Sequence, residues 1–81
     1  MKEMIEYIVK ALVDKPEEVS VTETQGETAS IIEVRVATED AGKVIGREGR
    51  IANALRTLAK AAGAKDKKRI NFEIVTKEER K

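Results

Sequence analysis

Residues 42–50 read Gly-Lys-Val-Ile-Gly-Arg-Glu-Gly-Arg, and this stretch decides the fold because it places two glycines three apart between two helical patterns. The pattern before it predicts a short helix over Asp40–Ile45, with Thr38 or Asp40 as N-cap. The pattern after it predicts a longer helix from Arg50 to about Ala62. The packed face of that helix should carry Ile51, Leu55, Leu58, Ala59 and Ala62, and another face should carry Arg50, Asn53, Arg56 and Lys60. A loop with glycine at both ends turns tightly and lets a ligand approach its backbone. The helix that follows directs free N–H groups and a positive dipole end into that space, which suits phosphate.

Other glycine motifs that bind phosphate do not fit this spacing. A Walker loop needs four residues between its glycines and then Lys and Ser or Thr, whereas Gly42 and Gly46 enclose three residues and Arg47 and Glu48 follow. The dinucleotide fingerprint needs a further Gly-x-Gly, which is absent. The simpler alternative is a plain turn between two helices. Arginines inside the loop and directly after it favour the phosphate contact.

The rest of the chain supplies one more helix and three strands, recognised by their apolar periods of 3.6 and 2 residues. The expected ranges are a helix over Lys2–Asp14 and strands over Val19–Thr24, Ser30–Val36 and Arg69–Val75. Pro16 ends the first helix, because the residue before a proline is pushed out of the α region. Gly63 is placed to stop the last helix, and the charged segment from Thr76 to Lys81 is expected to be a frayed tail.

The resulting order, α-β-β-α-α-β, predicts a single α+β domain in which three helices cover one face of a three-stranded sheet. Ile70, Phe72 and Ile74 should face the helices. The opposite face should be polar and open to water, and it carries Ser20, Thr22, Glu33, Arg35, Asn71 and Glu73.

Composition narrows the function. The 81 residues include no Cys and no His, so the commonest nucleophile, general base and metal ligands are missing, and we expect neither an enzyme nor a metal or other cofactor. No apolar run reaches the length of a membrane span, and Glu3 comes too early for a signal peptide, so a cytoplasmic protein without membrane contact is expected. The net charge is only +1, so polyanion binding must rest on local clusters.

The order of elements and the segment Val44–Arg50 together resemble a prokaryotic, type II KH domain. From Gly42 to Ala62 the sequence is similar to small stand-alone bacterial KH proteins of the KhpA type. The resemblance spans the whole chain as one KH domain over residues 1–81, ordered over about 2–75. It implies binding of single-stranded RNA, of which a KH loop clamps about four nucleotides. In one departure, Ala52 stands where many KH domains carry a large aliphatic residue.

By this resemblance, Gly46 and Gly49 contact the sugar-phosphate backbone while the bases lie in an apolar groove beside the central helices. The residues expected to contact RNA are Lys43, Ile45, Gly46, Arg47, Glu48, Gly49, Arg50, Ala52 and Asn53. Candidates for the groove wall are Val44, Ile45, Ala52, Leu55 and Val36, of which Leu55 and Val36 fit core packing better. Glu48 repels phosphate and is expected to weaken binding. Tyr7 and Phe72 are the only aromatic residues, so no stacking platform is expected.

The family resemblance implies an RNA chaperone or post-transcriptional regulator that acts with a KhpB/Jag-type KH protein in cell-wall homeostasis and cell elongation. A homodimer is a further expectation, because one weak domain gains much from bivalency. A protein-interaction scaffold with little RNA affinity is the alternative. A DNA-binding helix-turn-helix is disfavoured, because the helix after Gly49 is rich in alanine and poor in base-reading side chains. The basic cluster Lys65, Lys67, Lys68 and Arg69 either extends a phosphate track or is a solvated loop.

Overall fold

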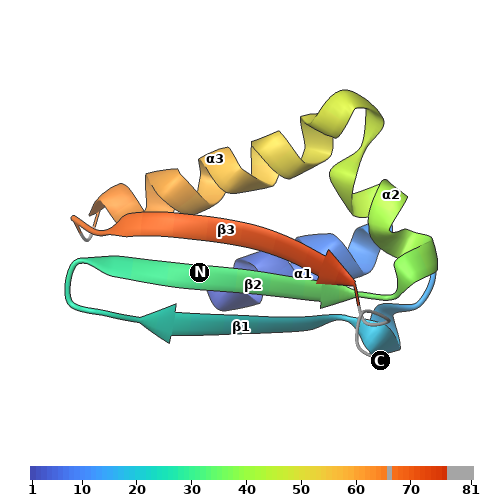
Figure 1. Cartoon of the computed structure of the whole chain (residues 1–81), viewed down its shortest axis with the longest axis horizontal. Coiled ribbons are helices and arrows are strands. Elements are labelled where there is room, and N and C mark those ends of the chain that lie inside the picture. The colour runs from blue at the N-terminus through green and yellow to red at the C-terminus, as the bar shows by residue number, and fades with distance from the viewer. Residues whose placement is uncertain (66, 77–81) are drawn as a thin grey trace.

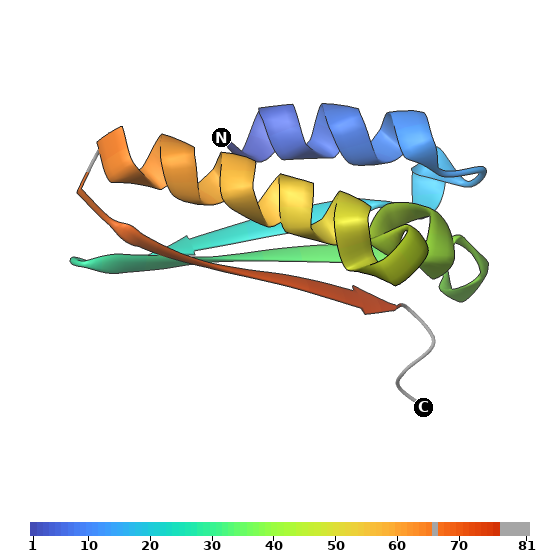
Figure 2. The same cartoon turned by 90° about the horizontal axis from the view of Figure 1, so that it is seen from above.

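The computed structural model describes residues 1–65 and 67–76 and confirms the α+β architecture of a type II KH domain. Three helices lie on one face of a three-stranded sheet, as Figure 2 shows from above. Short 3-10 turns over Pro16–Glu18, Thr38–Asp40 and Arg47–Gly49 join the elements. The α-helices are α1 (Lys2–Leu12), α2 (Ala41–Ile45) and α3 (Arg50–Lys65), and the strands are β1 (Ser20–Gln25), β2 (Ala29–Val36) and β3 (Arg69–Thr76).

The sheet has the order β1-β2-β3 and is mixed. β1 and β2 form an antiparallel hairpin in which Gln25 pairs with Ser30. β2 and β3 run parallel, because the chain crosses over the sheet through α2 and α3 between them. In Figure 1, α3 runs along β3, and α2 with its following loop lies at the end of the sheet opposite the hairpin.

The core lies between the sheet and the helices. The predicted inward residues of β2 are fully buried, and they meet buried residues of α1 and α3 such as Val9 and Ala59. The opposite face carries the expected polar side chains, exposed or half-buried. One apolar residue, Ile31, is also on this face, 45% exposed. Alternation therefore predicted the faces of the sheet correctly, as expected for a sheet with one wet side.

The prediction that Gly63 ends the last helix is wrong. α3 continues to Lys65, and Gly63 is buried against β3. A Cβ atom there would lie 2.3 Å from Cγ1 of Ile70, so glycine allows helix and strand to approach closely. The helix ends instead where Lys67 adopts φ 59°, while the Lys68 and Lys67 N–H groups donate to the carbonyls of Gly63 and Ala64.

Other boundaries differ by a few residues. α1 stops at Leu12, before the predicted Asp14, and Val13 is already extended. Leu58, expected on the packed face of α3, is 44% exposed. Thr76, expected to begin a frayed tail, is the last residue of β3 and pairs with Val36. The remainder of the predicted tail, residues 77–81, lies outside the described residues.

Candidate nucleic-acid interface

The loop between α2 and α3 has a backbone that requires glycine at one end and favours it at the other. Gly46 has φ 79°, and a Cβ atom there would lie 2.7 Å from Cγ1 of Ile51, so no other residue fits without displacement. Gly49 has φ 76°, but the space around it is open. Gly49 N–H donates to the Gly46 carbonyl over 3.1 Å, which closes the turn. Both glycines thus hold a tight, exposed loop at the start of a 16-residue helix.

The loop tip between the glycines carries charge of both signs. Glu48 has φ 57°, a left-handed conformation that is uncommon outside glycine, asparagine and aspartate. Its carboxylate lies 3.8 Å from the Arg50 guanidinium, and both side chains are more than 70% exposed. Such an exposed pair is worth little and yields easily to another anion. Arg47 is exposed and has no ion-pair partner among residues 1–65 and 67–76, so its guanidinium is available to a ligand.

Lys43, a predicted RNA contact, is less available to a ligand than Arg47, because its ammonium already lies near two carboxylates. It lies 3.3 Å from the Asp14 carboxylate and 3.8 Å from that of Asp40. Asp40 is 1% exposed, and its two carboxylate oxygens accept the backbone N–H groups of Asp14 and Lys15 at 3.2 and 3.0 Å. Asp40 is the N-cap residue of α2, one of the two predicted candidates, but its side chain makes no cap hydrogen bond to the helix. It instead ties the chain after α1 to the start of α2.

An exposed ion pair lies next to this anchor. The Lys15 ammonium donates to the Glu39 carboxylate over 2.7 Å. That hydrogen bond holds the pKa of Glu39 below its ordinary value and raises the pKa of Lys15. Both groups are open to solvent, so the pair adds little to stability and weakens in salt.

An open hollow of about 270 Å3 lies between α3 and β3. It is lined by Arg56 and Lys60 of α3, by residues 70–73 of β3 and by Ile31 of β2. Arg56 and Lys60 lie one helical turn apart, and Arg56 also donates to the Asn53 side chain over 2.8 Å. The sequence pattern predicted that both cations lie on one side of the helix, but the predicted site did not include them. Their i, i+4 spacing could have indicated that they lie together beside the site.

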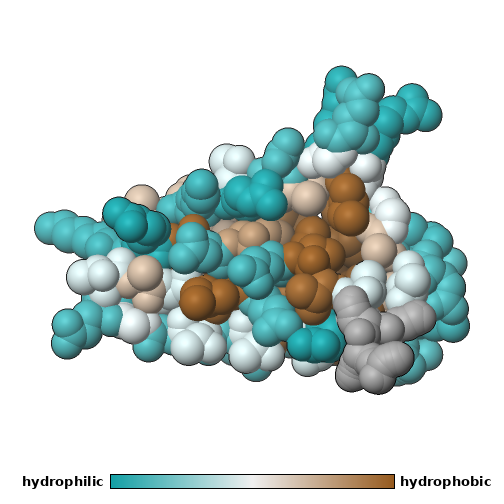
Figure 3. All heavy atoms as spheres, in the orientation of Figure 1, coloured by the Kyte–Doolittle hydropathy of each residue, from teal (hydrophilic) through white to brown (hydrophobic). Residues whose placement is uncertain are grey.

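The apolar surface that could serve as the predicted groove lies near α2. Figure 3 shows apolar surface gathered between β3 and the segment that holds α2 and the start of α3. Ile45, a predicted contact residue, is 40% exposed, and Ile51 and Ile74 are partly buried. Ala52 is 8% exposed and Asn53 is exposed on α3. Three predicted wall residues are core: Val44 and Val36 are fully buried, and Leu55 is 2% exposed. The prediction of Val44 as groove wall is therefore wrong.

These features define a class of protein: the mixed sheet, its helical face and the glycine-bracketed loop between α2 and α3 are those of a type II KH domain. The chain belongs to the KhpA/KhpB KH-domain family, whose family model matches residues 2–74. It is 55% identical over 75 residues to the RNA-binding protein KhpA of Clostridium perfringens and 56% identical over 75 residues to that of Caldanaerobacter subterraneus subsp. tengcongensis. Both alignments cover 93% of this chain and 100% of the relative.

A more distant relative supports the same assignment. The RNA-binding protein KhpA of Borreliella burgdorferi is 52% identical over 73 residues, which are 90% of this chain and 89% of the relative. No solved structure matched the chain significantly. In the described part of the chain, no helix is both long and apolar enough to cross a membrane, and no three acidic, His or Cys side chains cluster to hold a metal ion.

Proposed function

We propose that this protein binds single-stranded RNA without catalysing a reaction, and that the loop from Gly46 to Gly49 clamps the RNA backbone. The observation that carries the proposal is the loop itself. Two glycines with positive φ hold an exposed tip that bears an unpaired Arg47, at the N-terminus of a long helix. The relatives, which are named RNA-binding proteins, support the same ligand. Phosphate suits the free N–H groups and the positive dipole end at that terminus.

The RNA strand continues from the loop along the groove between α3 and β3. Ile45 offers an apolar contact for a base, and Arg56 and Lys60 offer positive charge one turn apart. Phe72 is 6% exposed, so it offers no platform for stacking. With about three or four phosphate contacts and no stacking, log Kobs should fall with log salt at a slope of about −2 to −3. We expect modest affinity and shallow sequence preference.

The cellular role that we propose is that of an RNA chaperone or post-transcriptional regulator in the cytoplasm. A KhpB/Jag-type KH protein is the proposed partner, and cell-wall homeostasis and cell elongation are the proposed processes. The support is the family, whose model describes KhpA and KhpB together. A single weak KH domain gains effective concentration when a second domain holds the same strand.

The test is fluorescence anisotropy of labelled single-stranded RNA with a variant that blocks the loop and keeps the fold. Gly49→Asp places a carboxylate at the clamp, in open space and at a positive φ that aspartate adopts more often than most residues do, although with some strain. Gly42→Asp adds the same charge in open space outside the loop, so it is the matched control. We expect Gly49→Asp to lose about tenfold or more in affinity and Gly42→Asp to stay close to wild type. Equal binding by both variants would show that the loop is only a turn.

A second candidate function, an interaction scaffold that forms homodimers, has its own observation. Tyr7 on α1 is 77% exposed, Met4 on the same helix is 39% exposed, and Leu58 on α3 is 44% exposed. Large apolar side chains at a surface often mark protein contacts. Light scattering with Tyr7→Ser/Leu58→Ser tests this candidate. A wild-type dimer that becomes monomeric, combined with no loop-dependent RNA binding, would place the scaffold first.

A further inference from the structure

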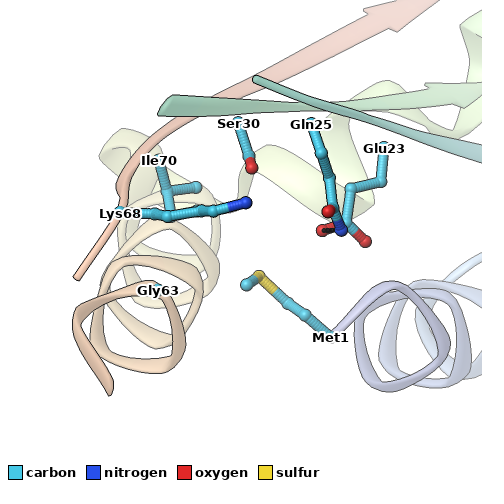
Figure 4. Close-up of a pocket in the computed structure, with 7 residues that line it drawn as sticks. All are labelled: Met1, Glu23, Gln25, Ser30, Gly63, Lys68 and Ile70. Carbon is cyan, nitrogen blue, oxygen red and sulfur yellow. Dashed lines mark hydrogen bonds between the residues drawn. The ribbon is translucent and has the colours of Figure 1, made fainter. Parts of the chain in front are cut away.

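A second hollow lies at the end of the domain opposite the loop, beside the β1–β2 hairpin. It measures about 130 Å3 and lies between the sheet, the N-terminal end of α1 and the C-terminal end of α3. Figure 4 shows Ser30, Lys68, Glu23, Gln25 and Met1 around it. The small residue Gly63 forms part of its wall. A cavity of about 150 Å3 in another protein holds benzene, so this hollow has room for one six-membered ring.

The strongest sign of a ligand is the Ser30 hydroxyl. Ser30 is only 2% exposed, yet its side chain makes no hydrogen bond to any residue among 1–65 and 67–76. Among residues 1–65 and 67–76, no fully buried side-chain oxygen or nitrogen atom lacks a partner, so the Ser30 hydroxyl oxygen retains access to the hollow. A polar group this deeply placed costs free energy unless something bonds to it.

The charged groups around the hollow are complementary but do not meet. The Lys68 ammonium extends across it toward Ser30, as Figure 4 shows, and the half-buried Glu23 carboxylate faces it from β1. These two charges form no ion pair within 4.0 Å. Among the described residues, Glu23 accepts a hydrogen bond only from Gln25, over 3.2 Å. A ligand here thus meets donors from Ser30 and Lys68 and an acceptor from Glu23. The thioether of Met1 and the side chain of Ile70 supply apolar walls.

We propose that this end hollow takes a pyrimidine ring, supplied by a nucleotide of the same RNA strand that the loop clamps. Uracil presents two carbonyl acceptors on either side of its N3–H donor, and cytosine presents one carbonyl, a ring-nitrogen acceptor and an amino donor, so each base offers both acceptors and donors to the groups on the walls. Their single ring also fits the volume better than a purine does. A thioether packs favourably against such a ring. The inference rests on the proposed RNA-binding function and extends the footprint of the strand.

The basic cluster at the start of β3 gives the strand a path to the hollow. Gly49 and Gly63 are separated by about 21 Å along α3, at 1.5 Å per residue. A strand clamped at the loop must therefore extend along most of α3 to reach the hollow. Lys65, Lys67 and Arg69 are exposed beside the hollow, and Lys68 lines it. In this proposal the basic cluster contacts the phosphates of the strand between the Gly46–Gly49 loop and the hollow.

The test compares RNA length and base type by anisotropy. The association constant is measured for oligo-U and oligo-A, each with four and with ten nucleotides. For each base, the constant for ten nucleotides is divided by that for four, and the quotient for U is then divided by the quotient for A. This double ratio cancels the added phosphates and binding registers. We expect about fivefold or more in wild type, since one bound base contributes on the order of 1 kcal/mol or more. Ser30→Ile, which fills the hollow with a strand-compatible side chain, and Lys68→Gln should both bring the ratio to about one.

Lys67→Gln is the matched control, because it removes the same charge from a neighbouring residue that does not line the hollow. It should weaken U and A equally and leave the ratio high. A wild-type ratio of about one, with four-nucleotide RNA still bound in a loop-dependent way, overturns this inference and leaves the proposed function standing. NMR shifts of Ser30 and Ile70 with uridine monophosphate, combined with a ratio of one, would overturn RNA as the source of the ring.

Discussion

Replacing Asp40 by asparagine should destabilise the domain more than its single-atom change suggests. Each carboxylate oxygen of Asp40 accepts a different backbone N–H, that of Asp14 at 3.2 Å and that of Lys15 at 3.0 Å. Asparagine keeps one acceptor oxygen and puts an NH2 group at the other position. One backbone N–H then faces a donor in a site where Asp40 is 1% exposed. Hydrogen bonds to charged groups contribute about 1.5–3 kcal/mol, so Asp40→Asn should cost about that much.

The assay is urea unfolding followed by circular dichroism, with the midpoint lowered and the slope m unchanged. Asp14→Asn is the control, because it removes the same charge from an exposed carboxylate that also lies near Lys43. It should change the free energy of unfolding by less than about 0.5 kcal/mol. Domains of this kind are stable by about 5–15 kcal/mol, so the difference is measurable. Equal stability of the two variants would refute the reasoning that both carboxylate oxygens are needed.

Three further changes follow from single contacts. Gly63→Ala should lower the free energy of unfolding in urea by about 1–3 kcal/mol, since its Cβ would lie 2.3 Å from Cγ1 of Ile70. Ile70→Val should then cost less in that background than in wild type. Glu48→Asn should raise RNA affinity in anisotropy, because it removes a negative charge from the loop tip, and weaker binding would contradict this. Its stability should be unchanged or slightly higher, because asparagine adopts the φ of 57° at this position more readily than glutamate does. In an NMR titration the pKa of Glu39 should rise in Lys15→Met. Because folding lowers the pKa of Glu39, the small stability that the pair contributes is lost as the pH falls through that pKa. The same pKa of Glu39 in Lys15→Met and in wild type would count against the ion pair.

The features of the fold that depend on local periodicity were predicted correctly from the sequence. Strict alternation in β2 placed Ile32, Val34 and Val36 inside, and the paired glycines located the loop with the correct neighbours. The errors all depend on residues distant in sequence. Gly63 looks like a helix stop until Ile70 is seen against it, because close packing leaves no trace in the local pattern.

Asp40 shows the same limit at the candidate site. At the start of a helix, aspartate is typical of a cap, and only the fold reveals that its partners lie 25 and 26 residues away. The same anchor explains why Lys43, a basic residue near the loop, is held by carboxylates. Charge near a glycine loop therefore does not by itself predict which cations are available to a ligand.

The parallel pairing of β2 with β3 has a consequence for how the chain folds during synthesis. Ala29 pairs with Arg69 and Val36 with Thr76, so every contact of this ladder joins residues forty positions apart. β2 lies in the centre of the sheet, and one of its edges stays open until β3 leaves the ribosome. Such non-local pairing is slow to form, and an open edge can pair with another chain. The nascent domain should therefore stay prone to misassembly until β3 emerges, so the loop acquires its native setting only after β3 has paired with β2.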